Sequence, residues 1–203
     1  MLKVYKILPV GFAANTYLVT ADGKNAVAVD PAQAGIVKKA EALGLTVRHV
    51  LLTHGHYDHV GGCFELAKAG ADIYCGEAEK ELVSGEDSLY LKHGLPMPDF
   101  PVKATLTDGQ KITLCGMEFT VIATPGHTVG SVVYQVENHL FTGDTLFCQS
   151  VGRTDLPTGD GDKLFESIQK LYALDGDFTV HTGHDEDTTL SFERKHNFFI
   201  RAE

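Results

Sequence analysis

Four potential metal ligands lie within six residues of the chain: His54, His56, Asp58 and His59. They follow the apolar run 50–52, which is typical of a buried strand. A strand that ends in a glycine-containing turn can aim alternate side chains at one point, and a following helix brings His59 in from another direction. Four titratable groups so close together would repel one another on protonation unless a cation held them. The segment therefore predicts a metal site.

Three further candidate ligands share one local layout, in which a strand is followed by a glycine and then by the ligand. These are His127, Asp144 and His184. Glycine allows the backbone to turn sharply and to approach a metal closely. A single histidine of this kind is usually an ordinary polar residue, so the repetition of the layout is the evidence. Together with the first segment, it predicts one site built from seven side chains.

The elements that must position these groups include strands and helices in both halves of the chain. Apolar and β-branched runs predict strands at 4–8, 16–20, 26–29, 47–52, 73–75, 111–114, 118–123, 131–136, 139–142 and 178–181. Helical spacing predicts helices at 36–43, 59–68, 77–83, 164–172 and 191–200, and the apolar face of the second would be Val60, Phe64 and Ala67. We expect an α+β fold with mixed sheets layered with helices.

Length and composition restrict the class of protein. A chain of 203 residues with 43% hydrophobic residues is expected to form a single domain, 1–203, and no apolar run is long enough to span a bilayer. The net charge of −10, without a basic cluster, argues against nucleic acid and anionic membranes as partners. The start of the chain lacks the pattern of a signal peptide, so a cytoplasmic location is expected. The four cysteines form no C-x-x-C pair and are expected to be reduced and buried.

The ordered set of motifs resembles the metallo-beta-lactamase superfamily, and its hydroxyacylglutathione hydrolase (glyoxalase II) branch in particular. The matching segments are 53–62, 124–131, 141–147, 152–155 and 183–193, so the resemblance extends over nearly the whole chain. It implies a four-layer αββα sandwich, with the metal site at one edge of the two sheets.

The resemblance also divides the ligands between two divalent metal ions. The first would be held by His54, His56 and His127, the second by Asp58, His59 and His184, and Asp144 would bridge them. Zinc is the expected metal, with iron or manganese as alternatives. Zinc lowers the pKa of bound water to about 7. A metal-bound hydroxide acting with Asp58 and Asp144 would then be the nucleophile.

The expected function is hydrolysis of a small-molecule thioester of the glutathione type, such as S-lactoylglutathione. About 19 residues follow His184 (203 minus 184), too few for the C-terminal helical segment with which long glyoxalase II chains contact glutathione, so weak affinity is expected. The alternative is a persulfide dioxygenase that holds one iron through His54, His127 and Asp144. A non-catalytic binding module is disfavoured because all seven ligand positions are filled.

Several other residues have two open interpretations. Asp30 either orients a ligand histidine or begins an ordinary turn. Arg153 either pairs with Asp155 or faces a substrate carboxylate. His181 is expected to be structural, and His49, His93, His139 and His196 are expected at the surface. The irregular segment 84–102, with Tyr90, Lys92 and Phe100, is expected to form a loop or lid that contributes selectivity.

Overall fold

The first sheet contains the N-terminal half of the chain. In the computed structural model, which describes residues 1–85, 88–94 and 99–202, its strand order follows the sequence. The strands are β1 (Lys3–Ile7), β2 (Thr16–Thr20), β3 (Asn25–Val29), β4 (Thr46–Leu52), β5 (Asp72–Gly76) and β6 (Ala104–Leu106). The β1–β2 and β2–β3 pairs are antiparallel, and the pairs from β3 to β6 are parallel.

The second sheet contains the C-terminal half, in the order β14-β13-β10-β9-β8-β7. Its strands are β7 (Lys111–Leu114), β8 (Met117–Ala123), β9 (Val132–Val136), β10 (His139–Gly143), β13 (Thr179–Thr182) and β14 (Thr188–Thr189). The β10–β13 pair is parallel and the other pairs are antiparallel. A short hairpin of β11 (Leu146–Phe147) and β12 (Ser150–Val151) follows β10.

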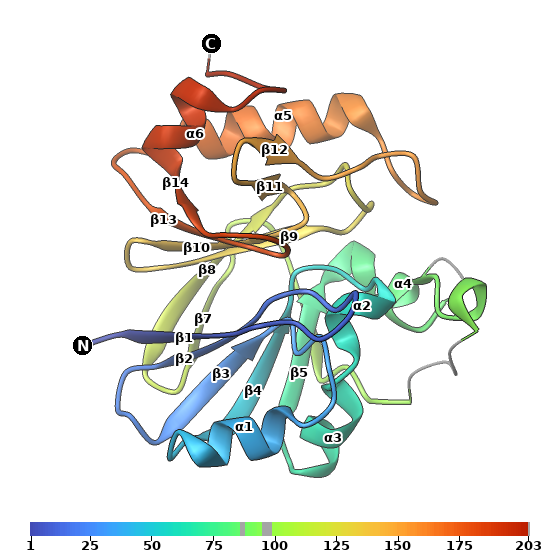
Figure 1. Cartoon of the computed structure of the whole chain (residues 1–203), viewed down its shortest axis with the longest axis vertical. Helices are drawn as coiled ribbons and strands as arrows, with labels where there is room; N and C mark the ends of the chain where they lie inside the picture. The colour runs from blue at the N-terminus through green and yellow to red at the C-terminus, as the bar shows by residue number, and fades with distance from the viewer. Residues whose placement is uncertain (86–87, 95–98, 203) are drawn as a thin grey trace.

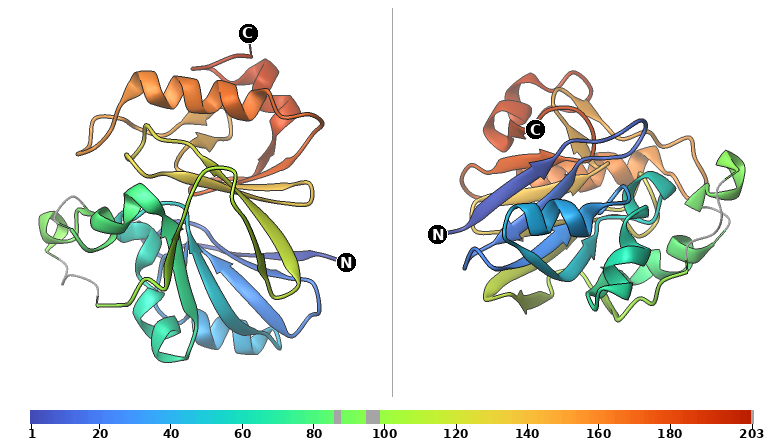
Figure 2. Two further views of the ribbon diagram at one scale, coloured as in Figure 1. Left: turned by 180° about the vertical axis from the view of Figure 1, so that it is seen from behind. Right: turned by 60° about the horizontal axis from the view of Figure 1, so that its bottom comes forward.

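Helices cover the outer face of each sheet, as Figures 1 and 2 show. The helices α1 (Ile36–Ala42) and α3 (Cys63–Lys68) lie against the first sheet, and α5 (Gly161–Tyr172) and α6 (Leu190–His196) lie against the second. The shorter elements are α2 (Tyr57–Val60), η1 (Glu77–Glu79), α4 (Lys80–Ser84) and η3 (Leu91–His93). The expected αββα sandwich with mixed sheets is confirmed. Among the described residues, no helix is both long and apolar enough to cross a membrane.

Alternation along the strands sends side chains into separate apolar layers. In β3, Ala26 and Ala28 face the helices α1 and α3, whereas Val27 and Val29 face the second sheet. Successive side chains of a strand point to opposite faces, so a strand buried on both sides reads as a continuous apolar run. A third layer lies between the second sheet and the helices α5 and α6. These layers fix the strands whose ends carry the candidate ligands.

The helix expected at 59–68 is divided into α2 and α3 by Gly61 and Gly62. The Gly62 N–H donates to the carbonyl of Pro31 at 2.6 Å, and a Cβ on Gly61 would lie 2.5 Å from the carbonyl oxygen of Ala32. The expected apolar face was therefore wrong in part, because Phe64 is 54% exposed. The Cys63 and Leu66 side chains of α3 are buried instead.

The cysteines also depart from expectation. Cys63 and Cys75 are buried, but Cys115 and Cys148 are partly exposed, and all four are free thiols. Cys115 lies in the turn between β7 and β8 with a φ of 49°, and Cys148 lies in the turn between β11 and β12. Turns at the ends of short strands lie at the surface, so these two side chains remain accessible to solvent.

Candidate metal centre

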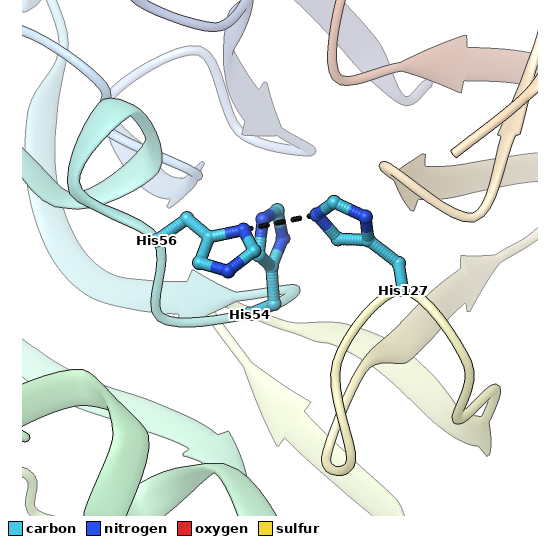
Figure 3. A group of neighbouring side chains, drawn as sticks. All are labelled: His54, His56 and His127. Atoms are coloured by element: carbon cyan, nitrogen blue, oxygen red, sulfur yellow. Dashed lines mark hydrogen bonds between the residues drawn. The ribbon is translucent and has the colours of Figure 1, made fainter. Parts of the chain in front are cut away.

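Three histidines from two loops form the first ligand group. His54 and His56 follow β4, and His127 lies in the loop after β8. Figure 3 shows their imidazole rings pointing toward one another. One ligand atom from each lies within 4.8 Å of the others, and His56 Nδ1 is 3.0 Å from His127 Nε2. All three side chains are buried. This is the set that the resemblance assigned to the first metal.

Asp58, His59 and His184 form a second group, again with ligand atoms within 4.8 Å of one another. Asp58 and His59 belong to α2, and His184 lies just beyond the end of β13. The His184 Nε2 atom lies 3.3 Å from Asp58 Oδ2. The structure thus brings residues of both sheets together at one edge of the sandwich, as expected for the second metal.

Asp144 lies between the two groups. Its Oδ1 is 3.1 Å from His59 Nε2. Its Oδ2 is 3.5 Å from His127 Nε2 and 3.6 Å from His184 Nε2. The carboxylate therefore reaches a histidine of the first group through one oxygen and histidines of the second through both, which is the position that a bridging ligand requires.

The positions before Asp144 and His184 require glycine because a Cβ atom there would clash with neighbouring side chains. Gly143 has a φ of +49°, in the left-handed region, and a Cβ there would collide with the Thr53 side chain. A Cβ on Gly183 would collide with Asp144 Oδ1 and would lie 2.9 Å from His59 Cε1. The glycines let the ends of β10 and β13 approach the ligand cluster closely.

The donor set fits metal ions. Within the described part of the chain, most of the buried side-chain nitrogen and oxygen atoms without a hydrogen-bond partner belong to this cluster. They are His54 Nε2 and His56 Nε2, together with His59 Nε2 and Asp144 Oδ1, which lie 3.1 Å apart without a well-directed hydrogen bond. Leaving a buried polar atom without a partner costs about 1–3 kcal/mol. Imidazole nitrogens and carboxylate oxygens concentrated in this way are suited to divalent transition metals.

The electrostatic environment keeps His54 and His56 of the first group neutral. Burial and the neighbouring imidazoles lower the pKa of His54 well below its ordinary 6.5, and they lower the pKa of His56 to about 3. Neutral imidazoles have the free lone pairs that a metal needs. At neutral pH these side chains are therefore ready to act as ligands.

In and around the second group, the charged forms of the side chains are favoured instead of the neutral ones. Burial disfavours the charged form of Asp144, but His59 outweighs it and holds the pKa of the carboxyl well below its usual range. Burial also disfavours protonation of His59, yet Asp144 and Asp30 raise its pKa well above 6.5. His184 similarly lowers the pKa of Asp58 against the effect of burial. The carboxylates are thus ionised and available to cations.

Asp30 orients a ligand, which decides between its two interpretations. Its Oδ2 lies 2.9 Å from His59 Nδ1, and it also accepts a hydrogen bond from Thr53 Oγ1 at 2.6 Å. Its Oδ1 accepts the Thr53 N–H at 2.8 Å. When a metal ion displaces the proton from Nε2, an imidazole that donates through Nδ1 would present its Nε2 lone pair to that ion. Asp30 therefore fixes both the tautomer and the ring position of His59.

Glu79 is a buried residue of the site that sequence reasoning missed. Its carboxylate accepts the Gly55 N–H at 2.7 Å and the Thr128 hydroxyl at 2.9 Å. Gly55 separates His54 from His56, and Thr128 follows His127. Burial raises the pKa of Glu79 to about 7 even though these hydrogen bonds lower it. Glu79 thus joins the two loops that carry the first group.

A pocket of about 550 Å³ opens onto the cluster, and we call it the metal pocket. It is lined by ligands of both groups together with Leu89, Lys92, His93, Phe147, Val151, Arg153 and Leu156. Arg153 Nε lies 2.6 Å from Asp155 Oδ1, so the first of its two interpretations, the ion pair, is confirmed, and Arg153 also lines the pocket. The Arg153 carbonyl oxygen is 2.8 Å from His127 Nδ1, which fixes the ring of that ligand.

The other histidines and the 84–102 segment follow the expectations in part. His93 is exposed, but its ring stacks on Tyr57 at a centroid distance of 4.3 Å and lines the metal pocket. His181 is buried, and its Nδ1 lies 2.6 Å from Asp187 Oδ2, consistent with a structural role. His139, expected at the surface, is only partly exposed, and its Nδ1 lies 2.9 Å from His181 Nε2.

Within the segment 84–102, positions 86–87 and 95–98 lie outside the described residues.

An αββα sandwich with histidine and aspartate ligands at the strand ends of both sheets defines a class of metal-dependent hydrolase. The chain belongs to the metallo-beta-lactamase superfamily, whose family model matches residues 9–184. It is similar to hydroxyacylglutathione hydrolase GloC of Haemophilus influenzae, with 35% identity over 97% of this chain and 98% of that protein. The expected family and its glyoxalase II-like branch are thereby confirmed.

Comparison with solved structures supports the same fold and family. The BLEG-1 B3 metallo-beta-lactamase superposes with a TM-score of 0.89 and 33% identity, covering 98% of this chain and 99% of that chain. The protein TTHA1623, in a di-iron-bound form, superposes with a TM-score of 0.86 and 34% identity, covering 97% of this chain and 100% of that chain. Relatives that resemble this chain to a similar degree carry different activities or metals in their names, so the substrate and the metals must be argued from the site.

Proposed function

We propose that this protein is a dinuclear metal-dependent hydrolase of small thioesters, with glutathione thioesters such as S-lactoylglutathione as the leading substrates. The observation that supports the proposal is the position of Asp144 between two complete ligand groups. The full-length similarity to a hydroxyacylglutathione hydrolase supports the choice of substrate. The chemistry that the metal pair supplies when bound is a hydroxide nucleophile at neutral pH and a Lewis acid for the substrate carbonyl.

The side chains of this protein provide the metal ligands and hold these ligands in position. His54 and His56 are neutral and Asp58 is ionised at neutral pH, because burial, imidazole neighbours and His184 set their pKa values. Asp30 and the Arg153 carbonyl hold the rings of two ligand histidines. The donor atoms are therefore positioned before the substrate arrives, which reduces the reorganisation needed during the reaction.

Cationic side chains supply substrate contacts in the metal pocket. Lys92 and Arg153 line its wall, and both lie near Asp155, whose pKa Arg153 and, to a smaller extent, Lys92 lower to about 2. A carboxylate of the thiol portion of a substrate would be attracted to these cations. Because Arg153 is already paired with Asp155, this contact is expected to be weak.

The deciding experiment combines metal analysis with activity. Purified protein should contain about two transition-metal ions per chain and should hydrolyse S-lactoylglutathione, followed by release of the free thiol. Oxygen consumption with glutathione persulfide is measured on the same sample. One iron per chain with persulfide-dependent oxygen consumption would establish the dioxygenase and refute the hydrolase. Against that alternative, Asp58 and His184, which a single iron held by His54, His127 and Asp144 would not need, complete a second group.

A further inference from the structure

A second pocket, of about 660 Å³, adjoins the metal pocket, and we call it the apolar pocket. Tyr57 and Asp58 line both pockets, so the two pockets adjoin at these side chains. The side chains that give the apolar pocket its character are Val10, Phe12, Val60, Phe64, Tyr90 and Phe100. The function proposed above assigns no role to this space.

The apolar pocket presents large hydrophobic side chains to solvent. Phe12 is 88% exposed, Val10 71% and Phe64 54%. Contiguous exposed apolar side chains around a cavity are typical of ligand sites, whereas a core would bury them. The loop that carries Val10 and Phe12 joins β1 to β2 and lies beside α2 (Figure 1). Its end is fixed there, because the Ala14 N–H donates to the Asp58 carbonyl at 2.9 Å.

The charges of the two pockets match the two halves of a thioester, which are a thiol portion with carboxylates and an uncharged acyl group. The charged residues that line the apolar pocket are Asp58 and Asp99, which disfavour an anionic ligand. The cationic Lys92 and Arg153 line the metal pocket instead. A substrate whose carbonyl lies at the ligand cluster would therefore place carboxylates toward these cations. An uncharged, apolar group on the other side of the carbonyl would enter the apolar pocket.

We propose that the apolar pocket binds the acyl group of the substrate, and that the preferred substrates are thioesters of apolar acyl groups larger than lactoyl. This inference rests on the proposed thioesterase function. In the reaction the carbon–sulfur bond breaks, the oxygen of water forms the new bond to the acyl carbon, and the leaving thiolate takes up a proton. Phe12 and Phe64 determine specificity by contacting the acyl chain of the substrate. Neither side chain acts on the reacting atoms.

A binding measurement tests the pocket without catalysis. Titration calorimetry on the metal-loaded enzyme compares S-methylglutathione with S-hexylglutathione, which cannot be hydrolysed as thioesters. We expect the hexyl compound to bind at least tenfold more tightly, because each buried methylene contributes to affinity. Phe12→Ala should remove most of this difference. The matched control is Phe199→Ala, because Phe199 is also exposed, at 68%, and lines neither pocket.

A kinetic series then tests the acyl group itself. With acetyl-, butanoyl- and hexanoylglutathione, kcat/KM should rise by up to about fourfold for each added methylene. The hexanoyl-to-acetyl ratio should fall several-fold in Phe12→Ala and in Phe64→Ala, and it should be unchanged in Phe199→Ala. Because only the ratio is compared, a general loss of active protein does not alter the result.

The outcomes separate the inference from the function on which it rests. Equal binding of the two S-alkyl compounds, together with a flat acyl series, would overturn the acyl pocket. A change in sedimentation mass in Phe12→Ala, with the acyl preference retained, would also overturn it and identify the patch as a contact between copies of the chain. If no thioester is hydrolysed but hexyl binding still depends on Phe12, the thioesterase proposal fails and the apolar ligand site is supported.

Discussion

The carboxylate of Glu79 accepts a hydrogen bond from the backbone N–H of Gly55, 2.7 Å away, at the midpoint between two ligand histidines. The same carboxylate accepts the hydroxyl of Thr128 at 2.9 Å, beside the third ligand of that group. Glu79 is fully buried at the end of η1. One acidic side chain therefore sets the distance between the two loops that hold the first metal group.

Replacing Glu79 by glutamine should weaken metal binding. Glutamine offers only one acceptor oxygen, so the Gly55 N–H can keep its acceptor only if the Thr128 hydroxyl is turned to donate to Ser131 Oγ, 2.6 Å away, and to accept from the NH₂ group. Residues that support metal ligands typically contribute 10–100-fold to affinity, and we expect about a tenfold loss. Competition with a chromophoric chelator measures it. Glu77→Gln, in the same turn but exposed, is the control, and equal affinities in the two variants would remove Glu79 from the site.

Replacing Asp144 by alanine should affect the protein far more than replacing Arg153. Asp144 lies within 3.6 Å of His59, His127 and His184, so both ligand groups lose an oxygen in the variant. We expect less than two metals per chain and a loss of turnover of at least a hundredfold. Arg153→Ala should retain its metals and should mainly raise KM. Elemental analysis and steady-state kinetics measure both. Full metal content and normal turnover in Asp144→Ala would exclude its bridging role.

Asp30→Asn should lower stability as well as metal affinity. Asp30 accepts hydrogen bonds from the N–H and the hydroxyl of Thr53 and from His59, in a site where its side chain is buried. Asparagine can satisfy only part of this set, and an unsatisfied buried group costs about 1–3 kcal/mol. Urea unfolding of the metal-free protein tests this effect. The exposed Asp175→Asn is the control. If the two variants unfold alike, Asp30 does not brace His59 and Thr53.

The ligands could be predicted from the sequence because their signals are local. His54, His56, Asp58 and His59 are close in the chain, and a glycine after a strand precedes each of the other three ligands. Glu79 had no such signal. Its partners lie 24 and 49 residues away, and an acidic residue early in a helix is usually solvated. Similarly, the break at Gly61 depends on the backbone of Ala32, a tertiary contact that helical periodicity does not contain.

The apolar pocket had even less signal in the sequence. Phe12 lies in a loop between two predicted strands, and an isolated aromatic residue there has no periodicity to interpret. Phe64 has helical spacing, so it was assigned to the core, whereas the division of the helix leaves it 54% exposed. The segment with Tyr90 and Phe100 was expected to contribute selectivity, and both residues do line this pocket. Their convergence depends on how the β1–β2 loop, α2 and α3 meet.

Acid should destabilise the metal-free protein through the first ligand group. The pKa of His56 is about 3 in the folded protein and about 6.5 when unfolded, so at intermediate pH only the unfolded chain binds that proton. Stability is therefore present above pH 6.5 and is lost as pH falls toward 3. His54, whose pKa is also lowered by burial, acts in the same direction. Each contributes a slope of up to about 1.4 kcal/mol per pH unit.

Between about pH 6 and 4.5, Glu79 acts in the opposite direction, because its pKa is raised to about 7, so the share of His56 is obtained by comparison with His56→Ala. The pKa values of His59 and His184 are raised, so below about pH 5.5 both states bind these protons and the contribution of these two histidines is nearly constant. The lowered pKa values of Asp58 and Asp144 matter only nearer the ordinary carboxyl value of 3.8. Urea unfolding of chelator-treated protein across this range should give a falling free energy, with a smaller slope in His56→Ala. A slope that is unchanged by His56→Ala would show that this imidazole is not held neutral by the folded protein.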